Sequence, residues 1–256
     1  MSDSWRSYLE FATEMAWQAG QLTLGYFQTD LRPEFKEDES PVTVADREAE
    51  RLIRSRIEQA YPGHAIVGEE FGEKAGAGAS HRWLVDPIDG TRSFVRGVPL
   101  YAVLLGLEVE GRVEVGVAYF PALGEMLAAA TGEGCWWNGR RTRVSTVDDL
   151  SKAIISFTDA ATFARYQREQ AWRRFQQCGA TVRGWSDAYG YLLVATGRVE
   201  AMLDPIMSAW DCAPFPPILR EAGGYFGNWQ GEETIYAAEA MATNAALREE
   251  VLALVG

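Results

Sequence analysis

The sequence predicts a mixed α/β protein whose helices and sheets are stacked in layers. Three observations lead to this fold class. Residues 1–145 show two amphipathic helical patterns and then strands that follow one another through tight turns. Residues 146–256 alternate strand and helix, which is typical of layered α/β proteins. With 256 residues, 47% of them hydrophobic, the chain can bury a large core without a disulfide or structural metal, and we expect both halves to form one compact unit.

Two helices are expected in the first half. Apolar residues recur at helical spacing over residues 5–26. Thr43 can cap a second helix, with Asp46 at its third position in an Asp variant of the capping box, and Pro62 and Gly63 end this helix. Asp46 could therefore serve only to offset the helix dipole. Lys36, in the extended segment before the helix, is interpreted as a solvated charge.

Strands and a loop complete the first half. The predicted strands cover residues 65–68, 83–85, 100–107, 112–120 and 126–130, and a tight turn is expected at residues 138–139. Residues 72–80 are rich in Gly and Ala, which predicts a mobile loop that could cover a neighbouring site. Whether this loop closes over a substrate is left open.

The second half alternates between strand and helix. Its predicted strands are residues 153–157, 181–183, 200–203 and 240–243, and its predicted helices are residues 160–177, 187–196, 210–221 and 245–254. Because a Gly pair follows residue 221, the third of these helices is expected to end there.

Composition excludes several classes of function. The net charge of −12 disfavours nucleic-acid and anionic-membrane partners, which are bound by clustered Lys and Arg. Three widely spaced cysteines argue for a reducing compartment and against a zinc cage. No signal peptide is apparent, and the longest apolar run is too short to span a bilayer, so a cytoplasmic protein is expected. His64 and His81 fit no catalytic or zinc spacing and are interpreted as surface residues.

The most informative motif lies at the end of the strand at residues 83–85. Asp86 and Asp89 follow that strand, and a tight turn could aim both carboxylates and the Ile88 carbonyl at one hard cation. If a helix opens next, the backbone N–H groups of Gly90 and Thr91 would form an anion seat beside the cation. The alternative is a plain solvated turn, because Pro-x-Asp-Gly is a common turn sequence.

Four acids could share one cleft. Glu69, Asp86, Asp89 and Asp211 all lie at predicted element ends, and no basic residue is locally placed to neutralise them. Such carboxylates would repel one another unless a divalent metal bound there, and an all-oxygen set selects Mg²⁺ or Mn²⁺ over zinc. Each acid also has an ordinary structural role open to it, such as a helix cap for Asp211.

Three motifs in this order resemble the inositol monophosphatase family of metal-dependent, lithium-sensitive phosphatases. They are Gly68-Glu69-Glu70, Asp86-Pro87-Ile88-Asp89-Gly90-Thr91 and Trp210-Asp211-x-Ala213-Pro214. The similarity runs over nearly the whole chain. It implies a layered αβαβα sandwich, a homodimer and a phosphate ester as substrate.

The resemblance also implies roles for individual residues. Glu69, Asp86 and the Ile88 carbonyl would hold one Mg²⁺, and Asp86, Asp89 and Asp211 a second, while Glu69 would help to place a third, weaker ion.

A catalytic group is implied beside these metal ligands. Asp46 with Thr91 would orient and deprotonate the attacking water, and Glu69 would contribute through its ions. The Gly90 and Thr91 amides would bind phosphate oxygens. This chemistry needs no protein nucleophile.

The sequence departs from the inositol-specific pattern at Arg92-Ser93-Phe94, Trp185-Ser186-Asp187 and Asp204-Pro205. These stretches resemble the histidinol-phosphate phosphatase branch of the family, which implies hydrolysis of histidinol phosphate in histidine biosynthesis. Extra carboxylates would suit a substrate with an ammonium and an imidazole. The implied substrate contacts are Asp89, Arg92, Asp187, Asp204 and Asp211.

Two other functions stay open. One is an inositol or broad-specificity phosphomonoesterase on the same scaffold. The other is a non-catalytic member that binds metal or a partner, although the presence of Asp46 and Thr91 argues against it, because a binding module needs no water-activating pair.

Overall fold

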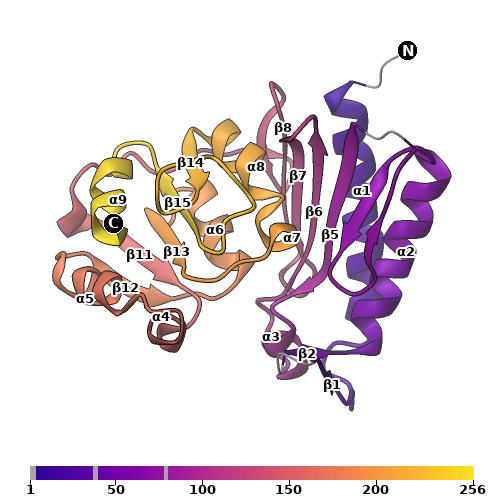
Figure 1. The fold of residues 1–256 in the computed structure, drawn as a ribbon, viewed down its shortest axis with the longest axis horizontal. Helices are drawn as coiled ribbons and strands as arrows, with labels where there is room; N and C mark the ends of the chain where they lie inside the picture. Colours follow the sequence, from indigo (N-terminus) through magenta and orange to yellow (C-terminus); the bar gives the residue numbers. More distant parts are fainter. Residues whose placement is uncertain (1–3, 37–39, 78–79) are drawn as a thin grey trace.

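The computed structural model describes residues 4–36, 40–77 and 80–256, and its helices and sheets form five layers (Figure 1). Helices α1 and α2 cover the outer face of a large sheet, α6, α7 and α8 lie between the two sheets, and α4, α5 and α9 cover the outer face of the smaller sheet. The predicted αβαβα sandwich is therefore confirmed. No helix in the described part of the chain is long and apolar enough to cross a membrane.

The helices have the following bounds: α1 Trp5–Leu24, α2 Val44–Ala60, α3 Thr91–Val95, α4 Ala160–Arg165, α5 Glu169–Gln177, α6 Ala188–Ala195, α7 Ala209–Cys212, α8 Phe215–Ala222 and α9 Arg248–Val255. The Thr43 side chain accepts from the Ala45 N–H, and Asp46 accepts from the Thr43 N–H, so the predicted capping box of α2 is confirmed.

The large sheet has eight strands in the order β10-β9-β8-β7-β6-β5-β3-β4. Among the described strands of this sheet, only β3 and β5 run parallel to each other. The bounds are β3 Ala65–Gly68, β4 Gly72–Lys74, β5 His81–Asp89, β6 Ala102–Val109, β7 Arg112–Phe120, β8 Glu125–Ala130, β9 Gly134–Trp137 and β10 Arg140–Arg141. The predicted turn at Asn138 and Gly139 joins β9 to β10.

The smaller sheet has five strands in the order β12-β11-β13-β15-β14. Its bounds are β11 Ile154–Phe157, β12 Thr181–Gly184, β13 Ala201–Asp204, β14 Gly224–Gly227 and β15 Ala240–Asn244. A separate two-stranded ribbon, β1 Glu34–Phe35 and β2 Pro41–Val42, precedes α2.

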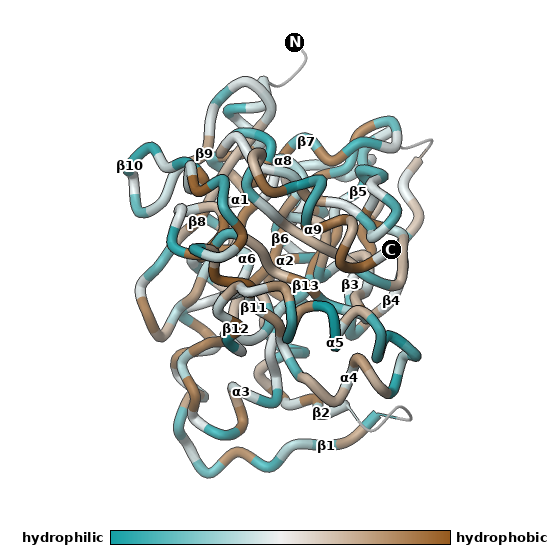
Figure 2. The backbone as a smooth tube through the Cα atoms, turned by 90° about the vertical axis from the view of Figure 1, so that its left-hand side faces the viewer, coloured by the Kyte–Doolittle hydropathy of each residue, from teal (hydrophilic) through white to brown (hydrophobic). Residues whose placement is uncertain are grey.

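Three large hydrophobic cores of the described residues hold the layers together. Trp83 and Ile53 lie in the core between the large sheet and α1 and α2. Phe215 and Met202 belong to the core between the two sheets, and Phe163 belongs to the core under α4, α5 and α9. Figure 2 shows the matching pattern in the chain, with hydrophilic residues along α5 and at β10, on the outside of the sandwich.

Several predicted boundaries were wrong for identifiable reasons. Residues 160–177 form two helices, because the chain turns at Gln167, where φ is 60°. The helix predicted over residues 210–221 is likewise divided into α7 and α8. Of the loop predicted at residues 72–80, Gly72–Lys74 instead pairs with β3 as strand β4, and residues 78–79 lie outside the described part. Strands β1, β2, β9, β10 and β14 were not predicted, and three of them, β1, β2 and β10, are only two residues long.

The two histidines are less exposed than predicted. His64 and His81 are half-buried and stack with their ring centroids 4.6 Å apart. Trp83 Nε1 lies 3.1 Å from His64 Nδ1 and donates to it, so His64 is held in an aromatic cluster at the end of the large sheet.

The middle layer approaches the large sheet closely at two glycines. Gly106 on β6 and Gly116 on β7 lie opposite each other in the sheet. A Cβ atom at Gly106 would lie 2.6 Å from the Ala213 Cβ, and one at Gly116 would lie 2.0 Å from the Pro214 carbonyl oxygen. The connection between α7 and α8 therefore rests directly on the sheet backbone, which places α7 beside the end of β5.

We expect Gly116→Ala to lower the free energy of unfolding by about 1–3 kcal/mol, because the added methyl group overlaps backbone that cannot move alone. Urea denaturation monitored by Trp fluorescence would measure the change. Gly63→Ala is the matched control, because no atom lies within 4 Å of its added Cβ. Equal stability of both variants would show that the contact at Gly116 is not tight.

Candidate active site

Three carboxylates converge where the large sheet meets the middle layer. Asp86 and Asp89 come from the end of β5, and Asp211 comes from the first turn of α7. One oxygen from each lies within 4.8 Å of the others, and this is the only such group of potential metal ligands found among the described residues. Residues more than 120 positions apart in the sequence thus meet at one point.

The end of β5 is irregular rather than a simple turn. The strand continues through Pro87 to Asp89, which lies opposite Ala102 on β6. The prediction that both acids follow the strand in a tight turn was therefore wrong. The register shifts between Asp86 and Asp89, and Asp86 Oδ1 accepts the Ile88 N–H at 3.0 Å. This irregularity brings both carboxylates to the same site.

Backbone N–H groups orient the other two acids. Asp211 Oδ2 accepts from the Ser208 N–H at 2.9 Å, so its predicted role as a helix cap is present. Asp89 Oδ2 accepts from the Ala188 N–H at the start of α6 at 2.8 Å. These contacts join the cluster to β5, α6 and α7.

The electrostatics of the cluster favour a cation. Asp86 is only 2% exposed, and its pKa is raised well above the usual range, first by burial and then by the charges of Glu69, Asp211 and Asp89. Burial likewise raises the pKa of Asp89 well above its usual range and that of Asp211 to about 7. Bound divalent metal would offset this repulsion, and the carboxylate oxygens suit Mg²⁺. The donor set therefore fits the predicted ion.

Glu69 has a basic partner that was not predicted. Lys36 Nζ lies 2.7 Å from Glu69 Oε1 and 2.7 Å from Glu70 Oε1. Burial lowers the pKa of Lys36, but its hydrogen bonds to both carboxylates outweigh burial and raise it. The interpretation of Lys36 as a solvated charge, and the statement that no base is placed near these acids, were both wrong. No local pattern indicates a pairing across 33 residues.

Asp46 combines a structural and a potential catalytic contact. Its Oδ2 accepts from the Thr43 N–H at 2.8 Å, while its Oδ1 lies 3.4 Å from Thr91 Oγ1. Thr91 Oγ1 also lies 3.0 Å from the Ile88 carbonyl oxygen. Burial raises the pKa of Asp46 to about 6. The cap role therefore does not use the oxygen that faces Thr91.

The anion seat predicted at Gly90 and Thr91 would lie where α3 begins. Gly90 precedes the helix with φ of 77°, and α3 starts at Thr91, as the sequence predicted. A Cβ atom at Gly90 would lie 3.0 Å from Asp187 Oδ2, so the Asp187 carboxylate lies beside Gly90.

Asp187 has an unusual backbone. Its φ of 55° and ψ of −151° are in a region that only glycine adopts readily, which costs about 1–3 kcal/mol. Its side chain does not cap α6. Burial raises its pKa, while hydrogen bonds from Ser186 and Ser93 and the charge of Arg92 oppose that shift. Strain of this kind is concentrated at functional sites.

Asp204 has protein partners on both oxygens. Its Oδ1 accepts from the Thr158 N–H at 3.1 Å, and its Oδ2 accepts from the Tyr191 hydroxyl at 3.0 Å. Asp204 is only 3% exposed, and burial raises its pKa to about 7. Through these contacts Asp204 connects the end of β13 to the segment after β11 and to α6.

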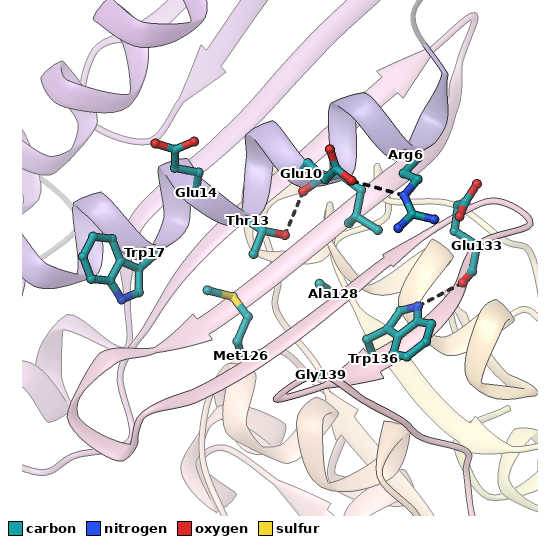
Figure 3. A pocket seen from close by; sticks show the side chains of 11 residues that line it. Arg6, Glu10, Thr13, Glu14, Trp17, Met126, Ala128, Glu133, Trp136 and Gly139 are labelled. Carbon is teal, nitrogen blue, oxygen red and sulfur yellow. Dashed lines mark hydrogen bonds and ion pairs between the residues drawn. The ribbon is translucent and has the colours of Figure 1, made fainter.

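A separate apolar groove of about 640 Å³ lies between α1, β8 and β9. Figure 3 shows Thr13 and Trp17 on the side of α1 toward Met126, whereas the Glu14 carboxylate points away from Met126. The groove shares no residue with the acidic cluster. The groove is mainly hydrophobic, and the carboxylates in its lining do not form a group of potential metal ligands. The candidate active site is therefore the cluster of Asp86, Asp89 and Asp211.

Known proteins are similar to this chain in sequence and in fold. The sequence profile of the inositol monophosphatase family matches residues 4–255. A histidinol-phosphatase from Chlorobaculum parvum is 43% identical over 97% of this chain and 96% of its own, and one from Mycobacterium tuberculosis is 37% identical over 95% and 96%. The structure of an IMPase from Thermotoga maritima matches with a TM-score of 0.88 and 30% identity, over 97% of this chain and 96% of that chain. The chain therefore belongs to the inositol monophosphatase family.

Proposed function

We propose that this protein is a Mg²⁺-dependent phosphomonoesterase that hydrolyses histidinol phosphate to histidinol and phosphate. The observation that carries the metal dependence is the convergence of Asp86, Asp89 and Asp211 within 4.8 Å. These three acids, together with Glu69 and the Ile88 carbonyl, would hold two to three ions, and Mn²⁺ could replace Mg²⁺.

Bound Mg²⁺ would lower the pKa of water and neutralise charge on the phosphoryl group. The protein would contribute positioning and a proton acceptor. Asp46 Oδ1 faces Thr91 Oγ1, and a pKa of about 6 suits a carboxylate that must accept a proton near neutral pH. The Gly90 and Thr91 amides at the start of α3 would hold phosphate oxygens.

The proposed substrate rests on similarity and on Asp187. The two relatives described above, both histidinol-phosphatases, match almost the full chain. Asp187 lies beside the anion seat, so its carboxylate is placed to meet a cationic group on a phosphorylated alcohol. Arg92 lies close enough for its charge to act on Asp187. We propose that Arg92 contacts the substrate together with Asp89, Asp204 and Asp211.

A second candidate is hydrolysis of inositol phosphate, favoured by the 30% identity to the Thermotoga maritima IMPase. For either substrate, we also propose a cytoplasmic homodimer that lithium inhibits at a weak metal position. A phosphate-release assay with histidinol phosphate, inositol phosphate and 3′-phosphoadenosine phosphate would decide among substrates. Preference for inositol phosphate would overturn the main proposal.

Asp86→Asn should reduce phosphate release by at least about 100-fold, because it removes a charge from the centre of the cluster. Exhaustive chelation of the wild-type protein should do the same, and added Mg²⁺ should restore activity. Asp148→Asn, at an exposed aspartate, is the control for the substitution. Full turnover in excess chelator would refute the metal dependence.

The stability of the chelated protein should fall as pH rises. Unfolded carboxyls have a pKa of about 4, whereas burial raises the pKa of Asp204 and that of Asp211 to about 7 in the folded protein. Between these values unfolding releases protons, so the stabilisation present below pH 4 is lost as pH rises through 7.

Thermal unfolding between pH 4 and 8 would measure this effect. Saturating Mg²⁺ should raise Tm most at pH 8, where the clustered carboxylates are ionised. Asp211→Asn should raise the Tm of the chelated protein at pH 8 and weaken its response to Mg²⁺. A chelated protein whose Tm does not change over this range would contradict the predicted repulsion.

Asp187→Ala should lower kcat/KM for histidinol phosphate. The corresponding activation free energy should rise by about 1.5–3 kcal/mol, the range for a lost charge-assisted hydrogen bond. The effect on p-nitrophenyl phosphate, which has no cationic group, should be much smaller. Asp204→Ala is a less clean test than expected from sequence, because it also leaves the Tyr191 hydroxyl without its acceptor. Equal losses on both substrates would assign Asp187 to the fold or the phosphate seat.

A further inference from the structure

Glu50 is a completely buried acid on α2 that the proposed chemistry does not use. Its exposed fraction is 0%. Glu50 Oε1 accepts from Arg54 Nε at 2.6 Å and from the Phe71 N–H at 3.3 Å, and Oε2 accepts from the Glu70 N–H at 2.7 Å. Both carboxylate oxygens are therefore engaged, and two of the three donors are backbone groups of the turn that carries Glu69.

The turn after β3 is held from two sides. The Glu69 N–H donates to the Val85 carbonyl of β5 at 3.2 Å, which is the residue before Asp86. On the other side, Glu50 holds the N–H groups of the next two residues. The backbone of Glu69 is thus fixed between the strand that bears Asp86 and the helix that bears Glu50.

Gly68 makes this contact possible. A Cβ atom at Gly68 would lie 2.0 Å from Glu50 Oε1 and 2.5 Å from its Cδ. The Gly68 backbone does not have a positive φ, so glycine is required here for space and not for backbone conformation. The glycine of Gly68-Glu69-Glu70 therefore leaves room for the buried carboxylate.

Arg54 strengthens the same connection. Its guanidinium also donates to the Gly72 carbonyl, and the Phe71 ring lies under Arg51 and Arg54, at 4.9 Å and 6.0 Å from their guanidinium carbons. Asp46, Glu50 and Arg54 are spaced four residues apart and share one face of α2. One rigid helix thus holds both Asp46 and the turn of Glu69.

We infer that Glu50 is a positioning residue for Glu69. It sets the place of the Glu69 carboxylate relative to Asp86 and Asp46 without touching the reacting atoms. This inference rests on the proposed function, in which Glu69 binds Mg²⁺. Residues that support metal ligands in this way alter metal affinity by about 10-fold to 100-fold when they are replaced.

Glu50→Gln tests this role with a minimal change of shape. A glutamine has one acceptor oxygen and one NH₂ group, so it must place a donor against Arg54 or against a backbone N–H of the turn. We expect Mg²⁺ affinity, measured by calorimetric titration of the chelator-treated protein, to fall about 10-fold to 100-fold. The KM for substrate at saturating Mg²⁺ should change much less.

Glu48→Gln is the matched control. Glu48 is on the same helix and accepts a hydrogen bond from the Tyr26 hydroxyl at 2.7 Å, so this variant removes the same charge away from the turn. Its Mg²⁺ affinity should equal that of the wild type. Gly68→Ala provides a second perturbation, because its methyl group would displace the Glu50 carboxylate. If Glu50→Gln does not fold, the Mg²⁺ affinity of Gly68→Ala tests the inference instead.

The double variant identifies the route of the effect. If both substitutions act through the Glu50 contact, combining them should weaken Mg²⁺ binding by less than the product of the single effects. Wild-type Mg²⁺ affinity in Glu50→Gln, even with a lower Tm, would overturn the inference and leave Glu50 a purely structural role. Absence of Mg²⁺ binding in the wild-type protein would instead overturn the proposed function on which the inference rests.

Discussion

Asp86, Asp89 and Asp211 hold like charges within 4.8 Å of one another, where burial raises the pKa of each carboxyl. Such an arrangement is unfavourable by itself, so the surrounding structure must impose it. The irregular end of β5 sets two of the acids, and the cap of α7 sets the third. A divalent cation held by such a group would offset the repulsion.

The close contact between the layers makes this possible. Because Gly106 and Gly116 have no side chains, the connection after α7 can rest on the backbone of the large sheet. This contact lies in the core between the two sheets, which contains Phe215 and Met202. The position of Asp211 is therefore determined by the packing of a large hydrophobic core. The free energy of that packing can offset the repulsion between the clustered carboxylates.

The other side of the site depends on charge compensation. Lys36 pairs with Glu69 and Glu70, and Glu50 accepts a hydrogen bond from the backbone of the same turn. The turn is thus restrained by a base that pairs with its side chains and by a buried acid that accepts from its backbone. Asp46 shares α2 with Glu50, so the positions of the proposed proton acceptor and the proposed metal ligand are coupled through one helix.

Local sequence patterns determined the fold class, most helices and strands, and the identity of the clustered acids. Periodicity, capping residues and the strand-end acids need only neighbours in the chain, and these predictions were confirmed for α1, α2 and the antiparallel hairpins. Tertiary structure alone decided the partner of Lys36, the strained place of Asp187 beside Gly90, and the reason for glycine at residue 68. Each of these depends on distances between segments that are far apart in sequence, and a local pattern contains no information about such distances.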